Sequence, residues 1–384
     1  MSASGRALLG AMVALCSWGS ALADPGTTVR LVREQVRIPA PGGYELAATI
    51  IRPQGPGPFG AVVLNHGFSA EEKERHAESW QAFSAAAPVF ARRGYAVIMP
   101  LRRGFGATGG ELAEDPGSCF RPHFFRGEEA AADDVMAAYD YARSLAYVDP
   151  QRMILAGQSA GGMVALFTAA MREPQGLVAV LGFAAGRGGG REPGVPCAAD
   201  ALGRVFDAVG ERIKVPVLLH YAQNDRFFGP GVSHAWFERL LAGGAQAEYV
   251  LQPPYGGDGH FLFTQLGGVE YWLPAVEHFL GEHGVPFARL DAGDPLIKAK
   301  LPGSRGCEGL YRVFLESPAP RAYALSDDGH CGFAGGVDDA AKAAMRECGQ
   351  IAEARCALYA VDDRMLWVAR EHQTLSAGLA AALK

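Results

Sequence analysis

Two kinds of hydrophobic pattern follow one another in the first part of the chain. The segments VRLVREQVRIPA (29–40) and YELAATIIRP (44–53) alternate apolar and polar residues on either side of Pro-Gly-Gly. This alternation predicts an antiparallel hairpin with one buried face. The next segment, GAVVLNHG (60–67), is instead a continuous apolar run. Such a run is typical of a strand that is buried on both sides in a parallel sheet.

Further runs of this doubly buried kind alternate with helical stretches as far as residue 280. They are YAVIMP, RMILAG, LVAVLGFAA, VPVLLHYA and AEYVLQ. Strands that alternate with helices imply right-handed crossovers and a mostly parallel, doubly wound sheet covered on both faces. The predicted fold class is therefore α/β. Helices are expected at about 71–93, 127–145, directly after Ser159, 234–241 and 269–280.

Two insertions interrupt the alternation. Residues 108–126 are polar and aromatic and contain Cys119, and residues 186–213 begin GRGGGREPGVPC and contain Cys197. Both follow predicted strands, so both are expected at the carboxyl ends of the sheet, where α/β enzymes build their sites. We expect Cys119 and Cys197 to form a disulfide across the mouth of that site. The alternative is two separate thiols in mobile loops.

The pattern changes after residue 284. Residues 285–306 resemble a linker, and residues 307–384, which we call the C-terminal module, contain four cysteines within about fifty residues. An α+β unit of this size buries little core, so disulfides would compensate. The expected elements are strands at 311–316 and 321–326, a helix at 338–348 with Asp338 at or near its cap, and a closing hairpin at 356–368.

The first residues have the pattern of an export signal. Arg6 precedes a short apolar stretch, and Ala21-Leu22-Ala23 forms a small-x-small cleavage site before Asp24. We therefore expect a signal peptide at 1–23, a catalytic domain at 24–284, and a secreted or periplasmic protein. Six cysteines follow residue 24, and an even number in an exported protein suggests disulfides, although six allow about 15 pairings.

Composition and charge exclude several classes of function. The chain has 384 residues, of which 49% are apolar and 20% charged, and its formal net charge is −6. This is a globular composition without the basic surface that would attract nucleic acid. No CxxC motif points to a zinc ribbon or a thioredoxin-like site, and no segment after the signal predicts a membrane span. The sequence does not predict an oligomeric state.

The segment MILAGQSAGGMVALF (153–167) contains the clearest candidate for chemistry. Its G-x-S-x-G motif lies between a predicted strand and a predicted helix, the setting of a nucleophile elbow. There the serine adopts a strained backbone conformation that small neighbours permit, and the N-terminus of the following helix favours negative charge. Ser159 is thus the predicted nucleophile. The alternative is that Ser159 only helps to form the turn.

A serine needs a base, and the base needs an orienting carboxylate. His260 in YGGDGHFLF lies in a Gly-rich loop between the last strand of the predicted sheet and the helix expected at 269–280, and is the best candidate base. Asp225 in HYAQNDRFFGP directly follows a predicted strand and is the best acid, with Asp258 as its rival. The alternatives are a helix-capping role for His260 and a turn-forming role for Asp225.

An oxyanion formed in such a reaction needs two donors that already point at it. We expect the backbone N–H of Ala160 and that of Phe68 in NHGF, where Gly67 allows close approach. His66 could serve as a second base, but its place before Gly67 favours a role as donor or in shaping the loop.

The segments LNHGFS, MPLRRGFGATGG, AGQSAGG, AQNDRFFGP and GDGHF, in this order, resemble the dienelactone-hydrolase-like branch of the α/β-hydrolases. Their spacing is also similar to that of prolyl oligopeptidase-type serine hydrolases, and the resemblance covers about residues 30–282. It implies an α/β-hydrolase fold with Ser159, Asp225 and His260 as a triad, in the expected chain order. True dienelactone hydrolases use a cysteine nucleophile, so a serine here favours general ester hydrolysis over the lactone.

Several other residues are candidates for the substrate pocket. Arg102 or Arg103 is expected to form internal ion pairs, and the sharper hypothesis is that Arg103 holds a substrate carboxylate. The aromatic candidates for lining the pocket are Phe120, His123, Phe124 and Phe227, which could equally be ordinary packing residues.

The leading functional hypothesis is a secreted serine esterase that acts on a small-molecule ester without metal or organic cofactor. A prolyl oligopeptidase-type peptidase or amidase is the first alternative. The second, from a different class, is a polymer-binding protein that acts through its C-terminal module.

Overall fold

The computed structural model describes residues 29–190, 192–299, 301, 305–351 and 355–366. The predicted signal peptide and the end of the C-terminal module lie outside these residues. Among the helices that are described, none is both long and apolar enough to cross a membrane.

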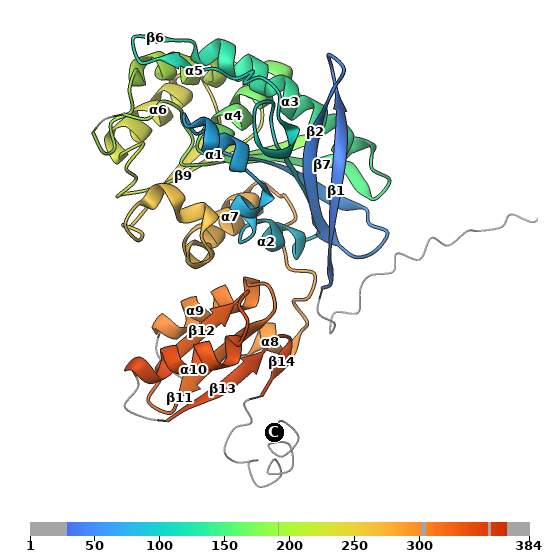
Figure 1. Cartoon of the computed structure of the whole chain (residues 1–384), viewed down its shortest axis with the longest axis vertical. Coiled ribbons are helices and arrows are strands. Elements are labelled where there is room, and N and C mark those ends of the chain that lie inside the picture. The colour runs from blue at the N-terminus through green and yellow to red at the C-terminus, as the bar shows by residue number, and fades with distance from the viewer. Residues whose placement is uncertain (1–28, 191, 300, 302–304, 352–354, 367–384) are drawn as a thin grey trace, which may run out of the picture.

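An eight-stranded sheet forms the centre of the larger part of the molecule (Figure 1). Its strand order is β1-β2-β4-β3-β7-β8-β9-β10. β2 pairs antiparallel with β1 and with β4, whereas all other neighbours in this sheet pair parallel. Only β2 therefore runs against the other strands, which confirms the predicted, mostly parallel α/β sheet and the N-terminal hairpin. The strands are β1 (Leu31–Ala40), β2 (Tyr44–Pro53), β3 (Phe59–Asn65), β4 (Tyr95–Pro100), β7 (Val148–Gln158), β8 (Leu177–Phe183), β9 (Val217–Ala222) and β10 (Ala247–Gln252).

Helices cover both faces of this sheet. In β3, Ala61 and Val63 pack into one apolar cluster while Val62 and Leu64 pack into another, and all four are fully buried. Successive side chains of a strand point to opposite faces, so a strand covered on both sides must be apolar throughout. The first face is covered by α3 (Phe124–Ser144), α4 (Ala160–Arg172), α5 (Ala199–Gly210) and α6 (Pro230–Ala242), and the second by α2 (Ala87–Ala91) and α7 (Val269–Glu282) (Figure 1).

The single helix expected at 71–93 is wrong. The structure has α1 (Glu72–Ala77), a 3₁₀ turn η1 (Trp80–Phe83) and the separate helix α2. Pro88 lies in the first turn of α2. Proline is tolerated there because its missing N–H would have no partner, but inside a longer helix it would break the hydrogen-bond ladder.

The C-terminal module contains a second, four-stranded antiparallel sheet of order β12-β11-β13-β14. In β11, Tyr323 and Leu325 pack with α9, whereas Ala322 and Ala324 pack with α10 on the other face. The module is thus a small α+β sandwich with a helix on each side. Its elements are α9 (Arg305–Glu316), β11 (Arg321–Ser326), β12 (Cys331–Gly335), α10 (Ala340–Ile351), β13 (Cys356–Val361) and β14 (Arg364–Met365), and the short helix α8 (Pro295–Lys298) lies in the predicted linker.

The strand expected at 311–316 is wrong, because these residues form the second half of α9. The buried side chains Cys307, Tyr311 and Phe314 follow one another at i, i+4 and i+7. This spacing is that of one helix face, and the short apolar run YRVFLE concealed it.

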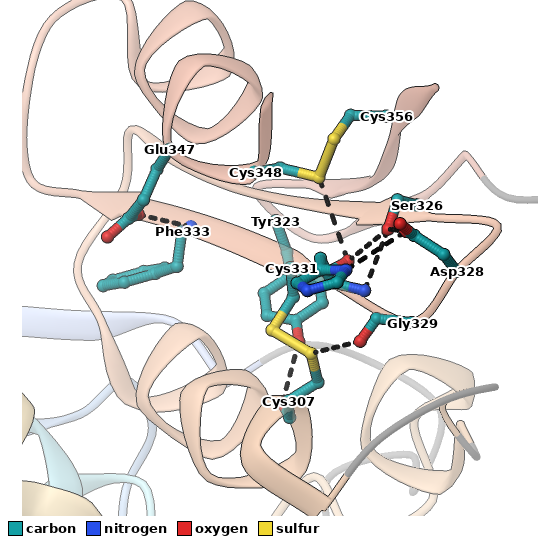
Figure 2. Close-up of a disulfide and its surroundings, with 11 residues drawn as sticks. Cys307, Tyr323, Ser326, Asp328, Gly329, Cys331, Phe333, Glu347, Cys348 and Cys356 are labelled. Atoms are coloured by element: carbon teal, nitrogen blue, oxygen red, sulfur yellow. Dashed lines mark hydrogen bonds and ion pairs between the residues drawn. A yellow bond between two sulfur atoms is a disulfide. The ribbon is translucent and has the colours of Figure 1, made fainter. Parts of the chain in front are cut away.

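Two disulfides connect the helices of the C-terminal module to its sheet (Figure 2). Cys307 of α9 pairs with Cys331 of β12, and Cys348 of α10 pairs with Cys356 at the start of β13. Beside them, the Tyr323 hydroxyl donates to the Cys307 carbonyl at 2.7 Å. The C-terminal module thus contains two disulfides, in agreement with the prediction from its four cysteines.

A buried ionic cluster joins the C-terminal module to the larger sheet domain. Glu316, at the end of α9, accepts hydrogen bonds from Arg93 at 3.0 Å and from Arg289 at 2.6 Å, and Arg92 lies 3.6 Å away. Burial alone would raise the pKa of Glu316, but the charges of the three arginines outweigh it and hold that pKa at about 2. One carboxylate therefore compensates several buried cations where the two parts meet.

Candidate active site

Ser159 occupies a sharp turn between β7 and α4. Its φ of 58° and ψ of −125° lie in a region that residues with a side chain rarely adopt. Close packing explains the flanking glycines: a Cβ on Gly157 would lie 2.3 Å from the backbone of Gly161, and a Cβ on Gly161 would lie 2.0 Å from the Asn65 carbonyl oxygen. The turn thus has the geometry of the elbow that the G-x-S-x-G motif predicts.

Backbone hydrogen bonds fix the turn on both sides. The N–H of Ser159 donates to the carbonyl of Phe183, and its carbonyl accepts from Gly162 and Met163 as α4 begins. The side chain of Gln158 donates to the carbonyl of His260 at 3.0 Å, which connects the elbow directly to the loop that carries the histidine. No sequence pattern predicts this role of Gln158, since it occupies a variable position of the G-x-S-x-G motif.

His260 and Asp225 form a buried pair beside this turn. Nδ1 of His260 lies 3.0 Å from Oδ2 of Asp225 and 3.1 Å from its Oδ1, and both side chains are nearly inaccessible to solvent. Oδ1 of Asp225 also accepts from the N–H groups of Phe227 and Phe228, each at 2.8 Å. These donors orient the carboxylate, which in turn holds the imidazole with Nδ1 as donor and leaves Nε2 as the acceptor nitrogen.

The rival carboxylate, Asp258, has a different position. Its Oδ1 accepts from the backbone N–H of His260 at 3.0 Å and from that of Arg226 at 3.1 Å, so it caps the 3₁₀ turn η3 (Gly259–Thr264). The structure thus places Asp225 against the imidazole and Asp258 against the backbone.

Ser159 and His260 line the same cavity, whose volume is about 840 Å³. The proposed oxyanion donors Phe68 and Ala160 line it as well. Gly67 is packed against the elbow, because a Cβ there would lie 3.0 Å from Oε1 of Gln158 and 3.4 Å from Cβ of Ser159. Gly67 and Phe68 of the segment NHGF therefore line one cavity together with Ser159 and Ala160 of the elbow.

Seven phenylalanine side chains form part of the wall of this cavity. Their rings offer apolar surface and few hydrogen-bonding groups, and such a wall suits an apolar ligand group. Cys119 and Cys197 form a disulfide, and both line the cavity. The predicted pairing of these two cysteines is thus confirmed. The aromatic lining residues are Phe68, Phe83, Phe105, Phe124, Phe227, Phe228 and Phe261.

The predicted aromatic pocket residues divide into two groups. Phe124 and Phe227 line the cavity, and the ring of Phe227 lies 4.3 Å from that of His260. Phe120 is instead 97% exposed, on the turn between β5 (Gly117–Ser118) and β6 (Arg121–Pro122). His123 is exposed as well. In the part of the chain that the structure describes, Phe120 and His123 do not line the cavity.

The predicted polar pocket residues lie behind the wall. Arg103 pairs with Asp134 at 2.8 Å and stacks on Tyr44, so its guanidinium is engaged inside the fold and does not line the cavity in the part of the chain described. His66 is buried, and burial together with Arg102 lowers its pKa to about 3. Arg187, which follows β8 and was not singled out from the sequence, does line the cavity.

The strand order, with β2 alone antiparallel, and the serine elbow after the fifth strand of the sheet are those of the α/β-hydrolase fold. Residues 81–176, which include the elbow, match the sequence model of the prolyl oligopeptidase family. No curated protein sequence matches the chain.

Several solved structures resemble this chain at low sequence identity. An esterase from Pyrococcus furiosus is 16% identical, with 66% of this chain and 90% of that chain covered and a TM-score of 0.47. An acetyl xylan esterase from Paenibacillus sp. R4 is 18% identical, with coverage of 66% and 90% and a TM-score of 0.45. A puromycin-hydrolysing peptidase from Mycobacterium tuberculosis is 18% identical, with coverage of 67% and 40% and a TM-score of 0.44.

Proposed function

We propose that the protein is a serine hydrolase that cleaves carboxylic esters through an acyl-enzyme on Ser159, with Asp225 and His260 completing the triad. One observation carries the proposal: His260, which is paired with the buried Asp225, lines the same cavity as a serine on a strained elbow. The backbone of Ser159 lies in a sparsely populated region, and strain of this kind clusters at active sites, which supports a functional role for this serine.

In the proposed reaction, Nε2 of His260 takes the proton from the Ser159 hydroxyl as the oxygen attacks the ester carbonyl. Asp225 holds Nδ1 and stabilises the imidazolium that forms. The proton then passes to the leaving alcohol, and water activated by the same imidazole releases the acid. The reaction needs neither metal nor organic cofactor.

The negative charge that develops on the carbonyl oxygen would be stabilised by the N–H groups of Phe68 and Ala160. The N-terminus of α4 at Ala160 adds a favourable dipole. A donor in such a position contributes about 3 kcal/mol of transition-state stabilisation.

The cavity has room for a small-molecule ester with a bulky apolar group. Its volume of about 840 Å³ and its seven phenylalanine side chains suit an aromatic or branched acyl or alcohol group.

We also propose that the chain is exported, with residues 1–23 as signal peptide, 24–284 as catalytic domain and 307–384 as an appended module. The three disulfides of the structure support an oxidising compartment, in agreement with the signal-like pattern of the first residues.

A peptidase or amidase is the second candidate, and the match to the prolyl oligopeptidase family favours it. Esters and amides pass through the same tetrahedral and acyl-enzyme states, so the triad does not distinguish them. The two activities are distinguished by turnover rates. These are measured with p-nitrophenyl acetate and with aminoacyl-proline p-nitroanilides, on the native protein and on Ser159→Ala. We expect turnover of the ester and its loss in the variant. Faster turnover of the anilide would assign the peptidase, and ester turnover that survives in Ser159→Ala would refute both.

A further inference from the structure

Arg102 lies directly behind the loop that carries the proposed oxyanion donor Phe68. Its side chain is fully buried and donates from Nη1 to the His66 carbonyl at 2.9 Å and from Nη2 to the Gly67 carbonyl at 3.2 Å. A guanidinium that serves two consecutive backbone carbonyls fixes the orientation of both peptide planes.

His66 supports the same two peptides from its imidazole. Its Nε2 accepts the backbone N–H of Arg102 at 3.1 Å, so the proton resides on Nδ1, which lies 2.8 Å from the Gly67 carbonyl oxygen. Burial and the charge of Arg102 lower the pKa of His66 to about 3. The imidazole therefore stays uncharged at neutral pH and keeps its proton on Nδ1. Gly67 thus has a carbonyl with two donors.

The orientation of the Gly67 carbonyl determines that of the next N–H group. The peptide bond between Gly67 and Phe68 is not among the cis bonds of the described residues, which are Gly57–Pro58 and Ala319–Pro320. In a trans peptide the C=O and the N–H point in opposite directions. Because the Gly67 carbonyl points at Arg102 and His66, the Phe68 N–H points away from them. Phe68 lines the same cavity as Ser159.

Arg102 is itself anchored on both edges. Nε donates to Oε2 of Glu114 at 2.7 Å and Nη2 to Oε1 at 3.0 Å, in a bidentate pair that is completely buried. Burial alone would raise the pKa of Glu114, but Arg102 and Arg187 lower it, so the anchor remains ionised. A flexible lysine could not reproduce this arrangement of four hydrogen bonds.

We infer that Arg102, held by Glu114 and assisted by His66, is a positioning residue that aims the Phe68 N–H at the developing oxyanion. The inference rests on the proposed function. The expected signature is a loss of transition-state stabilisation with little change in substrate binding.

The test compares Arg102→Lys with the unsubstituted full-length protein, using p-nitrophenyl acetate and an aryl trifluoromethyl ketone. The ketone forms a tetrahedral adduct with the serine, and its oxygen occupies the oxyanion position. Removal of one oxyanion donor costs roughly 10²- to 10³-fold in kcat, so a misaimed donor is expected to cost about 10- to 100-fold. The Ki of the ketone is expected to rise in parallel, while KM changes by less than about threefold.

Arg92→Lys is the matched control, because Arg92 is also a buried arginine that donates to two backbone carbonyls, those of Glu316 and Ser317, away from the cavity. An equal loss of kcat in both variants, an unchanged kcat in Arg102→Lys, or a rise in KM alone would overturn the inference. If Arg102→Lys shows no cooperative unfolding, Glu114→Gln decides by the same criteria. Absence of ester turnover in the unsubstituted protein would instead overturn the proposed function, and the inference with it.

Discussion

Oδ2 of Asp225 lies 3.0 Å from Nδ1 of His260, although 35 residues separate them in the chain. Asp225 follows β9 and His260 lies in the turn after β10, and these two strands pair in parallel. The carboxyl ends of parallel neighbours lie side by side, so the pairing of the sheet brings Asp225 to His260, and His260 lines the cavity that contains Ser159.

Replacement of this carboxylate tests the orientation of the imidazole. In Asp225→Asn the amide no longer stabilises an imidazolium and favours the wrong tautomer, so kcat for ester hydrolysis is expected to fall by about 10⁴-fold. Asp258→Asn is the matched control, because its side-chain oxygen can still cap the turn, and it is expected to lose less than about tenfold. A larger loss in Asp258→Asn than in Asp225→Asn would reverse the assignment.

The Cys119–Cys197 disulfide is expected to hold the wall of the cavity in place. It closes a loop of 78 residues, which in the chain-entropy view corresponds to about 4.5 kcal/mol. The double variant Cys119→Ser/Cys197→Ser should unfold at lower temperature and show a raised KM, since both residues line the cavity. Calorimetry and steady-state kinetics measure these effects.

The matched control is Cys348→Ser/Cys356→Ser, which removes a disulfide of the C-terminal module. It should lower stability and leave KM as it is. A raised KM in the control would argue against a role of the Cys119–Cys197 disulfide in the site. So would an unchanged KM in Cys119→Ser/Cys197→Ser.

The ionic cluster at Glu316 predicts a specific dependence of stability on pH. Its pKa of about 2 in the folded state lies below the ordinary value of about 4.3. Between these values the unfolded chain binds a proton that the folded chain does not, so stability is lost as the pH falls through this window. Urea unfolding should show the loss between pH 5 and pH 2.

Glu316→Gln should remove this dependence. The variant leaves three buried arginines without their shared carboxylate, which is expected to cost about 3–5 kcal/mol at neutral pH. The difference in the free energy of unfolding between the native protein and Glu316→Gln should shrink as the pH falls. A difference that stays constant down to pH 2 would show that another group causes the acid sensitivity.

The cavity wall predicts a preference for apolar acyl groups. Phe124 is buried in that wall, and Phe124→Ala would enlarge the pocket. We expect the ratio of kcat/KM for p-nitrophenyl butyrate to that for the acetate to change by at least about tenfold, the range typical of one or two methylenes in an apolar pocket. Exposed Phe120 is the matched control, and Phe120→Ala should leave the ratio unchanged.

The strands and the order of the candidate triad could be predicted because they depend on local patterns. β3 and its neighbours are apolar on both faces, and Ser159 lies between a strand and a helix in a motif that only small residues permit. Short elements were less predictable. The residues at 311–316 are helical because of contacts made along the whole of α9. A window of six residues is too short to show the helical spacing of its buried side chains.

The supports of the site were not predictable because they join distant segments. The Arg102–Glu114 pair, the Gln158 contact with the His260 carbonyl and the approach of Arg187 to the cavity depend on how loops meet in space. Nothing in the local sequence distinguishes the buried Arg102 from Arg103, whose guanidinium pairs with Asp134 instead.

The most direct test of the account is covalent labelling with a fluorophosphonate, followed by mass spectrometry of the digested protein. Phosphonylation requires a serine that a base activates and that an oxyanion site supports. The account predicts a single adduct on the peptide that contains Ser159, formed at a rate that collapses in His260→Ala. An intact Ser159 peptide after prolonged treatment, or an adduct on another serine, would contradict it.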